Sequence, residues 1–501
     1  MLTARQICAL FGLRRRMVRS RRTRAGLTLA GLAVPVVLAL AVWTGVRHDG
    51  DPDPDWMVPA LFASVALVAV IAPLAVGGGY QMFPEDHLVA YPVRPATAAF
   101  GSLLLSPLNL TWLAQVAGVA AATGYLAGPG PRLALAVLTA AAYVVLVCIA
   151  GAALAWALVG ARARRGGRVG IRVLAAALAG AAWVVAATGN GRPALHALPS
   201  RWAITLVKEA YTGSAAQWAT GFAVLVLGAV VAAGAAVRAC GWALTRVLDR
   251  SAGSAAGEPI RRRAPQASVF RELVAIDRAS VWRAPALRRG ILLLGTVPGA
   301  TAAVAGLPWP SVVMLPGIVA AGTGLLFGIN VFCLDAGGAA WLATLPQDPR
   351  TAYLAKARVL AETCLLTSMS TVLLAACRTP GVPNAAELAA VATAVVLGPI
   401  LVVATCMSIS VRRPHRAELR GPRDTPAPPG SMFVDTVLLS VSASFAGAVL
   451  AAGAYATDRP WLAPALGAAV AVPAVCSVLR GAHRWREPGR RARVVATVAA
   501  G

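Results

Sequence analysis

GGGYQMFPEDHLVAYPVRPATAAFG, residues 77–101, is a polar, proline-rich stretch between two long apolar runs. Pro92 and Pro95 lack a backbone donor, and each disfavours helical backbone in the residue before it, so the chain is expected to turn here. The charged and titratable side chains of the stretch are Glu85, Asp86, His87 and Arg94. Such side chains are too polar for hydrocarbon, so this segment is expected in water or at lipid headgroups. Its polar part, residues 83–100, is called the first elbow.

A second stretch, WLATLPQDPRTAYLA at residues 341–355, repeats part of this pattern and is called the second elbow. The residues that match, each 254 positions after Pro92, Pro95, Thr97 and Ala98, are Pro346, Pro349, Thr351 and Ala352. Four matches at one offset indicate a duplicated unit.

The composition is that of a membrane protein. Hydrophobic residues make up 58% of the chain and charged residues only 13%. Apolar runs of about 20 residues, the length that crosses a bilayer core, recur along the chain. We therefore expect an all-α polytopic membrane protein with about twelve spans. The predicted spans are 26–46, 57–78, 101–126, 133–160, 173–189, 217–237, 290–306, 311–332, 355–377, 387–409, 433–455 and 461–479.

The basic residues fix the expected orientation. With the N-terminus inside, 39 of the 46 Lys and Arg residues fall in alternate, inner segments, as the positive-inside rule requires. Both termini are then cytoplasmic, and the expected location is the bacterial plasma membrane, crossed many times. The same clustering explains the net charge of +26 without a nucleic-acid partner.

The chain divides into two similar halves. Residues 1–248 form a first six-span half, residues 249–268 a Ser- and Gly-rich cytoplasmic linker, residues 269–480 a second six-span half, and residues 481–501 a basic cytoplasmic tail. Each half begins with a basic amphipathic segment suited to a membrane surface. Both halves start on the same side of the membrane, so the predicted repeat is parallel.

The first half alone has a long outer loop before its sixth span, residues 189–218. Trp202, Leu206 and Ala210 are spaced for a short helix, and we expect an external, interfacial or re-entrant element. Deletion of residues 195–212 is expected to leave membrane insertion intact.

No catalytic or cofactor motif is present. A P-loop needs G-x-x-x-x-G-K-[ST], but Glu209 follows Lys208 and Ala357 follows Lys356. The eight cysteines form no C-x-x-C pair, and the five histidines are scattered over both expected sides. We expect neither a metal site, a nucleotide site nor a cofactor in this chain, and no enzyme activity of its own.

Polar residues within the predicted spans are candidates for a pathway or for contacts between helices. Glu362 stands out, with Arg358 one helical turn before it and able to pair with it. Snorkelling of that pair to the interface is an equal alternative. Thr363, Ser370 and Thr371 lie nearby. Asn109 and Gln115 are further candidates in the third span.

The order of elements resembles a permease of the type-two ATP-binding-cassette exporter class, with two six-span halves fused in one chain. That family has a cytoplasmic connecting helix, two spans, a coupling helix and four further spans, with short external helices before the sixth. YPVRP and LPQDP at the elbows, and RELVAIDRASVWRAPALRRG before the seventh span, carry a looser likeness.

The resemblance implies that the elbows receive the motion of a separate cytoplasmic ATPase, present in two copies, which holds the ATP. The elbow residues implied are Glu85, Asp86, His87, Tyr91, Pro92, Arg94, Pro95, Trp341, Pro346, Asp348, Pro349 and Arg350. Lipid surrounds the spans, and the substrate class (small molecule, lipid or peptide) stays open. The alternative is a single-chain secondary transporter driven by an ion gradient, which twelve spans in parallel halves also describe.

Overall fold

The computed structural model describes residues 21–47, 54–76, 94–103, 110–162, 164, 166–188, 190–251, 268–417, 426–428, 431–432, 434–441, 443, 447, 449–450 and 459–499. These residues form helices and their connections, with no strand among them. The chain separates into two compact units, Met1–Glu258 and Pro259–Gly501. The boundary between the units lies inside the segment 249–268 that the sequence suggests as a linker.

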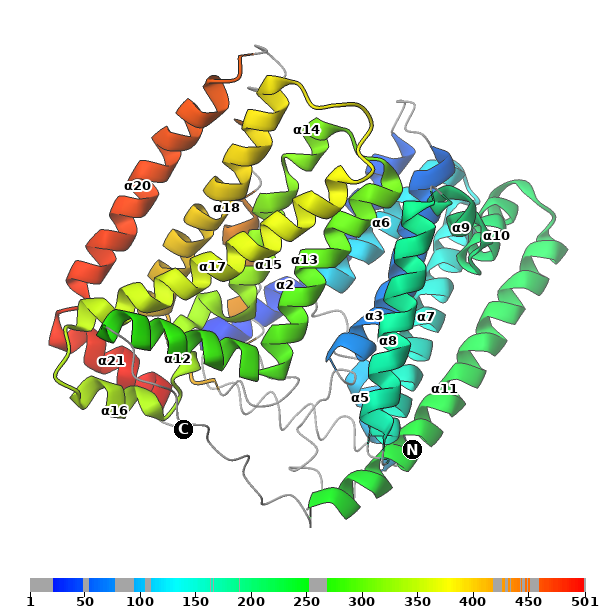
Figure 1. The fold of residues 1–501 in the computed structure, drawn as a ribbon. Helices are drawn as coiled ribbons and strands as arrows, with labels where there is room; N and C mark the ends of the chain where they lie inside the picture. The colour runs from blue at the N-terminus through cyan, green and yellow to red at the C-terminus, as the bar shows by residue number, and fades with distance from the viewer. Residues whose placement is uncertain are drawn as a thin grey trace. The chain divides into compact units, whose positions relative to one another are not determined.

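The first unit contains nine helices in its described part (Figure 1). They are α2 (Arg21–Val46), α3 (Pro54–Val76), α5 (Pro95–Leu103), α6 (Leu110–Ala127), α7 (Leu133–Arg162), α8 (Gly167–Ala187), α9 (Gly191–Ala197), α10 (Ser200–Thr212) and α11 (Ala215–Ser251). The predicted span 101–126 therefore covers the end of α5 and most of α6, and residues 104–109 between them lie outside the described residues.

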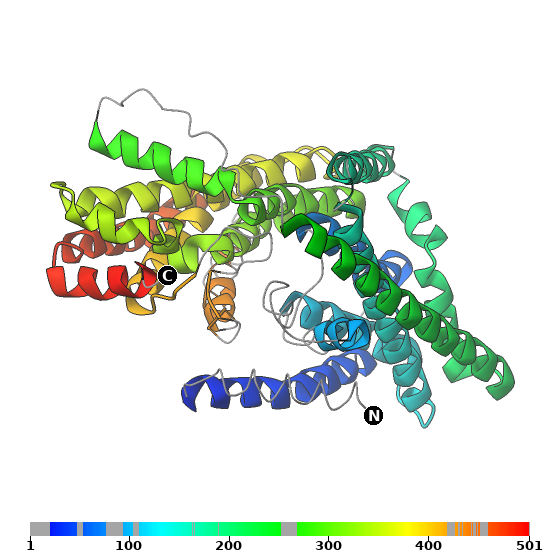
Figure 2. The ribbon, with the colours of Figure 1, turned by 90° about the horizontal axis from the view of Figure 1, so that it is seen from below.

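The second unit has the following elements in its described part: α12 (Val269–Arg283), α13 (Pro285–Ala305), α14 (Trp309–Val312), α15 (Leu315–Phe327), the 3₁₀ helix η2 (Gly328–Leu334), α16 (Gly338–Thr344), α17 (Pro349–Ala376), α18 (Ala385–Arg412), α20 (Leu462–Arg484) and α21 (Pro488–Ala499). Figure 1 shows α12, α16 and α21 at the same end of this unit. In Figure 2 the red α21 lies beside the yellow-green α16.

Among the described residues, six helical stretches are long and apolar enough to cross a membrane: Leu133–Arg162, Ala215–Thr245, Trp309–Leu334, Pro349–Ala376, Ala385–Arg412 and Leu462–Arg484. Each coincides with one predicted span. The predicted spans 26–46, 57–78, 173–189 and 290–306 coincide largely with α2, α3, α8 and α13, whereas 433–455 falls partly outside the described residues. An all-helical, membrane-embedded protein fits these helices, and the count of twelve stays a prediction.

The apolar side chains on the outer helices are exposed to an unusual degree. Leu227, Val230 and Val231 of α11 are each more than 60% exposed. In the apolar part of α11, Ala215–Thr245, only 11% of the residues of an 18-residue stretch are buried. The corresponding share for Trp309–Leu334 is 67%. Water would disfavour such a continuous apolar surface, whereas hydrocarbon chains would cover it at no cost.

Local sequence signals set where several helices begin and end. Pro285 and Pro349 occupy the first turn of α13 and α17, where a missing backbone N–H costs nothing. Asn384 and Glu387 form a reciprocal capping box at the start of α18. Gly306 ends α13 with a φ of 60°, a left-handed backbone that favours glycine.

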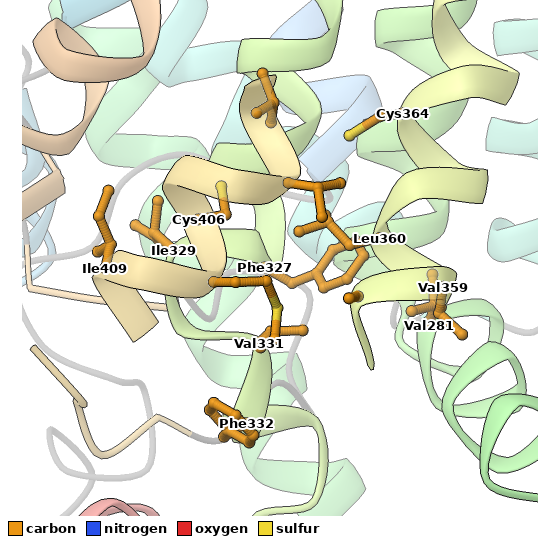
Figure 3. Packing of buried hydrophobic residues seen from close by; sticks show 14 of the residues in the cluster. Val281, Phe327, Ile329, Val331, Phe332, Val359, Leu360, Cys364, Cys406 and Ile409 are labelled. Atoms are coloured by element: carbon orange, nitrogen blue, oxygen red, sulfur yellow. The ribbon is translucent and has the colours of Figure 1, made fainter. Parts of the chain in front are cut away.

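Close packing joins the helices within each unit. In the first, a Cβ added at Gly45 of α2 would collide with the carbonyl of Ala121 on α6, so the two helices pack backbone to backbone. In the second, α12, α15, η2, α17 and α18 share one apolar core. Figure 3 shows Val281 of α12 beside Val359 of α17, and Phe327 close to Leu360.

The segment predicted as the outer loop of the first half does contain the expected helix, α10, and this helix is part of the core of the first unit. Ala203 and Val207 are at most 1% exposed and share an apolar cluster with residues of α3 and α7, while Leu206, 2% exposed, packs against Gly221 of α11. Arg132 donates to the carbonyl oxygens of Tyr211 and Gly213 at 3.4 and 3.1 Å. Deletion of residues 195–212 is therefore now expected to remove buried apolar surface and to destabilise the unit, contrary to the expectation from sequence.

Candidate functional site

The second elbow consists of part of the short helix α16, a turn, and the first residues of the next helix, α17. Helix α16 carries Trp341, which is 66% exposed, and ends at Thr344. Asp348 caps α17: its side chain accepts a hydrogen bond from the backbone N–H of Arg350 at 3.0 Å. Its carbonyl accepts one from Thr351 at 2.9 Å. Pro349 is then the first residue of α17, and Pro346 lies in the turn between the helices.

At the end of the first elbow, the chain enters a helix in the same way. Pro95 is the first residue of α5, as Pro349 is of α17. The carbonyl of Arg94 accepts a hydrogen bond from the N–H of Thr97 at 2.9 Å, which matches the bond from Thr351 to Asp348. Glu85, Asp86, His87, Tyr91 and Pro92 lie outside the described residues. The offset of 254 residues therefore relates two similar helix starts.

The C-terminal segment packs on the second elbow. Arg486 donates two hydrogen bonds to the Asp348 carboxylate, at 3.1 and 2.6 Å. Together with the hydrogen bond from Arg350, this lowers the pKa of Asp348 to about 2. Beyond Arg486, Val494 and Val498 of α21 are at most 2% exposed, and α21 contacts α16. The predicted basic tail 481–501 thus contains a docked amphipathic helix, and Asp348 already has a partner within the chain.

Glu362 joins the surface helix α12 to α17. The pair expected from spacing is present, with Arg358 Nε 2.6 Å from Glu362 Oε1. Arg278 of α12 forms a bidentate contact with the same carboxylate: its Nε and one terminal nitrogen each donate to a different Glu362 oxygen, both at 2.7 Å. This hydrogen bonding raises the pKa of Arg278. The Glu362 side chain is 25% exposed and lies midway along α17, so the arrangement favours a brace between helices over a buried pathway.

Lys356 forms a buried ion cluster that the sequence pattern did not reveal. Its Nζ lies 3.0 Å from Oδ1 of Asp277 on α12 and 2.8 Å from Oδ1 of Asp335, which follows η2. The side chains of Lys356, Asp277 and Asp335 are 2%, 5% and 14% exposed. Burial raises the pKa of Asp277, and the charge of Lys356 opposes that rise. A signal existed: a lysine within a long apolar run needs a buried partner.

The other polar candidates bond to neighbouring helices. Gln115 of α6 donates to the Ser64 carbonyl of α3 at 3.2 Å, whereas Asn109 lies outside the described residues. Thr371 of α17 donates to the Leu294 carbonyl of α13 at 3.1 Å. Thr363 and Ser370 donate within α17 itself. These groups join helices or satisfy their own helix, in keeping with the interhelical alternative.

A small cavity of about 110 Å³ lies between the second elbow, the end of η2 and α21. Its polar lining includes Asp335, Lys356, Gln347 and Arg491, and its remaining walls are mainly apolar, among them Phe332 and Trp485. The rings of Phe332 and Trp485 stack with centroids 4.4 Å apart. Within the described parts of the chain, no group of three or more His, Cys, Asp or Glu side chains could hold a metal ion.

Comparison of the chain with protein-family models, with curated proteins and with solved structures gave no match.

Proposed function

We propose that this chain is the membrane-spanning permease subunit of an ATP-driven exporter in a bacterial plasma membrane, energised by a separate ATPase chain. The observation that carries the proposal is the repeated elbow. Each unit contains a helix that begins at an elbow proline, with the same hydrogen bond to the carbonyl of the residue before it. A pair of similar elbows suits a partner that is present in two copies.

The second elbow also has the exposure that a docking element needs. Trp341 presents an aromatic side chain at the surface of α16, beside the exposed residues Ala340 and Thr344. Exposed aromatic residues commonly anchor protein interfaces. In this proposal the chain holds no nucleotide and has no catalysis of its own. It moves a small-molecule, lipid or peptide substrate through the helices.

The test is purification of the tagged chain in mild detergent from its own cells. A soluble ATPase with a P-loop should accompany the parent, and Trp341→Ala should lower the amount recovered by at least several-fold. Trp461→Ala is the matched control, since Trp461 is also exposed, at 59%, but lies at the start of α20 outside the elbow. Absence of any ATPase from the parent preparation would contradict the proposal.

A single-chain secondary transporter is the second candidate, and one feature favours it. The span Trp309–Leu334 is broken at Asn330, whose φ of −145° and ψ of 56° are not helical. Asn330 is fully buried and donates to the carbonyl oxygens of His415 and Pro426, both at 2.7 Å. Broken helices often mark substrate or ion sites in such transporters. Transport by this class would collapse when an ionophore removes the ion gradient, while ATP is held constant.

A further inference from the structure

Arginine side chains gather where α18 and α20 end, on the side of the second unit where α20 leads into α21 (Figure 1). Arg412 is the last residue of α18 and Arg484 the last residue of α20, with Arg480 one turn earlier. All three side chains are exposed. Helices α18 and α20 pack against each other, and Arg493 of α21 donates to the carbonyl of Val411 at 3.4 Å.

Acidic side chains around the end of α20 are already engaged with other arginines. The pairs are Asp348 with Arg486, Asp435 with Arg413, and Glu487 with Arg490. Among the described residues, no ion pair joins Arg412, Arg480 or Arg484 to an acidic side chain. Arg480 and Arg484 are also four residues apart on one helix, a spacing at which like charges repel. This end of the unit therefore has positive charge that an anionic partner would neutralise.

The side chains that precede these arginines on α20 suit hydrocarbon. Val472, Val475 and Leu479 are 61%, 42% and 43% exposed. They belong to Leu462–Arg484, which is long and apolar enough to cross a membrane, and only 17% of an 18-residue stretch of it is buried. Exposed apolar surface therefore gives way to positive charge just after Leu479. A phospholipid has the same layout, because its acyl chains continue into a charged headgroup.

We propose that the end of α20 next to α21 binds an anionic phospholipid, with Arg480 and Arg484 on its phosphate group and the preceding apolar side chains along an acyl chain. A planar guanidinium suits this role, because it donates two parallel hydrogen bonds to phosphate oxygens. Arg412 of the neighbouring α18 adds to the positive potential. An acidic protein would supply the charge but would not cover the apolar side chains, whereas a lipid matches both. The bound lipid would hold the turn into α21 at the membrane surface.

Native mass spectrometry tests this directly, because it counts the chains that retain a lipid. The purified chain in mild detergent is titrated with phosphatidylglycerol. Arg480→Gln and Arg484→Gln should each weaken binding roughly fivefold, the usual effect of one arginine at an anionic membrane surface. The double variant should bind more weakly than either. Arg459→Gln is the matched control and should bind as the parent does, because Arg459 is also exposed but lies just before the other end of α20.

Two further ligands separate the parts of the lipid. Phosphatidylcholine has the same chains without net charge, and glycerol phosphate has the charge without the chains, so each should bind much more weakly than phosphatidylglycerol. Equal binding of glycerol phosphate would overturn the proposal and would indicate a site for free phosphate.

Unchanged phosphatidylglycerol binding by the double variant, with monodisperse elution as the check that it folds, would also overturn the proposal. Loss of an acidic protein from that variant would then assign the arginines to a protein partner. An equal loss of binding in Arg459→Gln would show a general effect of charge and would overturn the site as well. The experiment needs no ATPase, so its outcome is independent of the proposed transport function.

Discussion

Each elbow ends in a helix that begins at a proline, but the contacts that hold these two helix starts in place differ. In the first unit, α5 begins at Pro95, whose ring faces Gly241 of α11 across an apolar contact. In the second, α17 begins at Pro349 and is surrounded by ion pairs that reach it from α12, from the end of η2 and from Arg486. A repeated sequence can thus fix a turn, while charges from elsewhere in the chain decide how firmly that turn is held.

The largest expected effect comes from removal of Lys356, the buried cation that directly follows the second elbow. Lys356→Met would leave Asp277 and Asp335 facing each other without a counter-charge. We expect a loss of roughly 3–5 kcal/mol of unfolding free energy, the usual cost of breaking a buried ion pair. Thermal or denaturant unfolding in detergent measures it. Lys208→Met is the matched control, because Lys208 is the other lysine of the chain and is exposed on α10.

A control that loses as much stability as Lys356→Met would show that the effect is not specific to the cluster. An unchanged Lys356→Met variant would remove the contrast between the elbows.

Glu362→Gln tests the half-exposed brace between α12 and α17. The change removes the carboxylate that Arg278 and Arg358 share. We expect a loss of about 1 kcal/mol, because water screens a pair whose arginine side chains are 53% and 63% exposed. Unfolding at low and high salt measures it, and salt should reduce the difference between variant and parent. Glu209→Gln on α10 is the control and should show neither effect. A loss that does not depend on salt would contradict this explanation.

The contact of the tail with Asp348 should respond to acid in a defined direction. Asp348 has a pKa of about 2 in the folded chain, below the usual value near 4. Its contribution to stability is therefore complete above the unfolded value and is lost as the pH falls towards 2. Trypsin is inactive in strong acid, so pepsin digestion follows the acid-induced release of α21. Trypsin, for which α21 offers several arginines, serves at neutral pH.

At neutral pH, Arg486→Gln should increase trypsin cleavage within α21 about two- to threefold, because water screens an ion pair between exposed side chains and keeps its contribution small. Arg484→Gln, one helical turn or less away at the end of α20, should leave cleavage at the parental rate. Equal cleavage of the parent and Arg486→Gln would show that burial of Val494 and Val498 alone holds the helix.

The smallest expected effect concerns the proline that begins the helix at the end of each elbow. Pro95→Ala and Pro349→Ala each remove a favourable first helical residue without disturbing a hydrogen bond. Both should cost less than about 1 kcal/mol, and by similar amounts, because proline acts here through the stiffness of the backbone. Unfolding of the two variants side by side measures this. A much larger loss for Pro349→Ala would mean that the proline ring also supports the charged surroundings of the second elbow.

The sequence alone predicted most of the long helices, although α5, α8, α13 and α17 begin five or six residues before the predicted spans. Apolar runs of bilayer length, the prolines at helix starts and the pairing of Arg358 with Glu362 all depend on residues within a few turns of each other. Such features recur with the helical period, so they are visible in the linear chain. The six long apolar helices of the structure fall on predicted spans for this reason.

Only the tertiary structure decided which distant charges meet. Lys356 pairs with Asp277 at a separation of 79 residues, Arg278 with Glu362 at 84, and Arg486 with Asp348 at 138. No spacing rule links residues so far apart, because their approach depends on how α12, α17 and α21 pack. The same reason explains why the sequence did not reveal that α10 is part of the core: its apolar spacing predicts a helix, but the face it buries depends on α3 and α7.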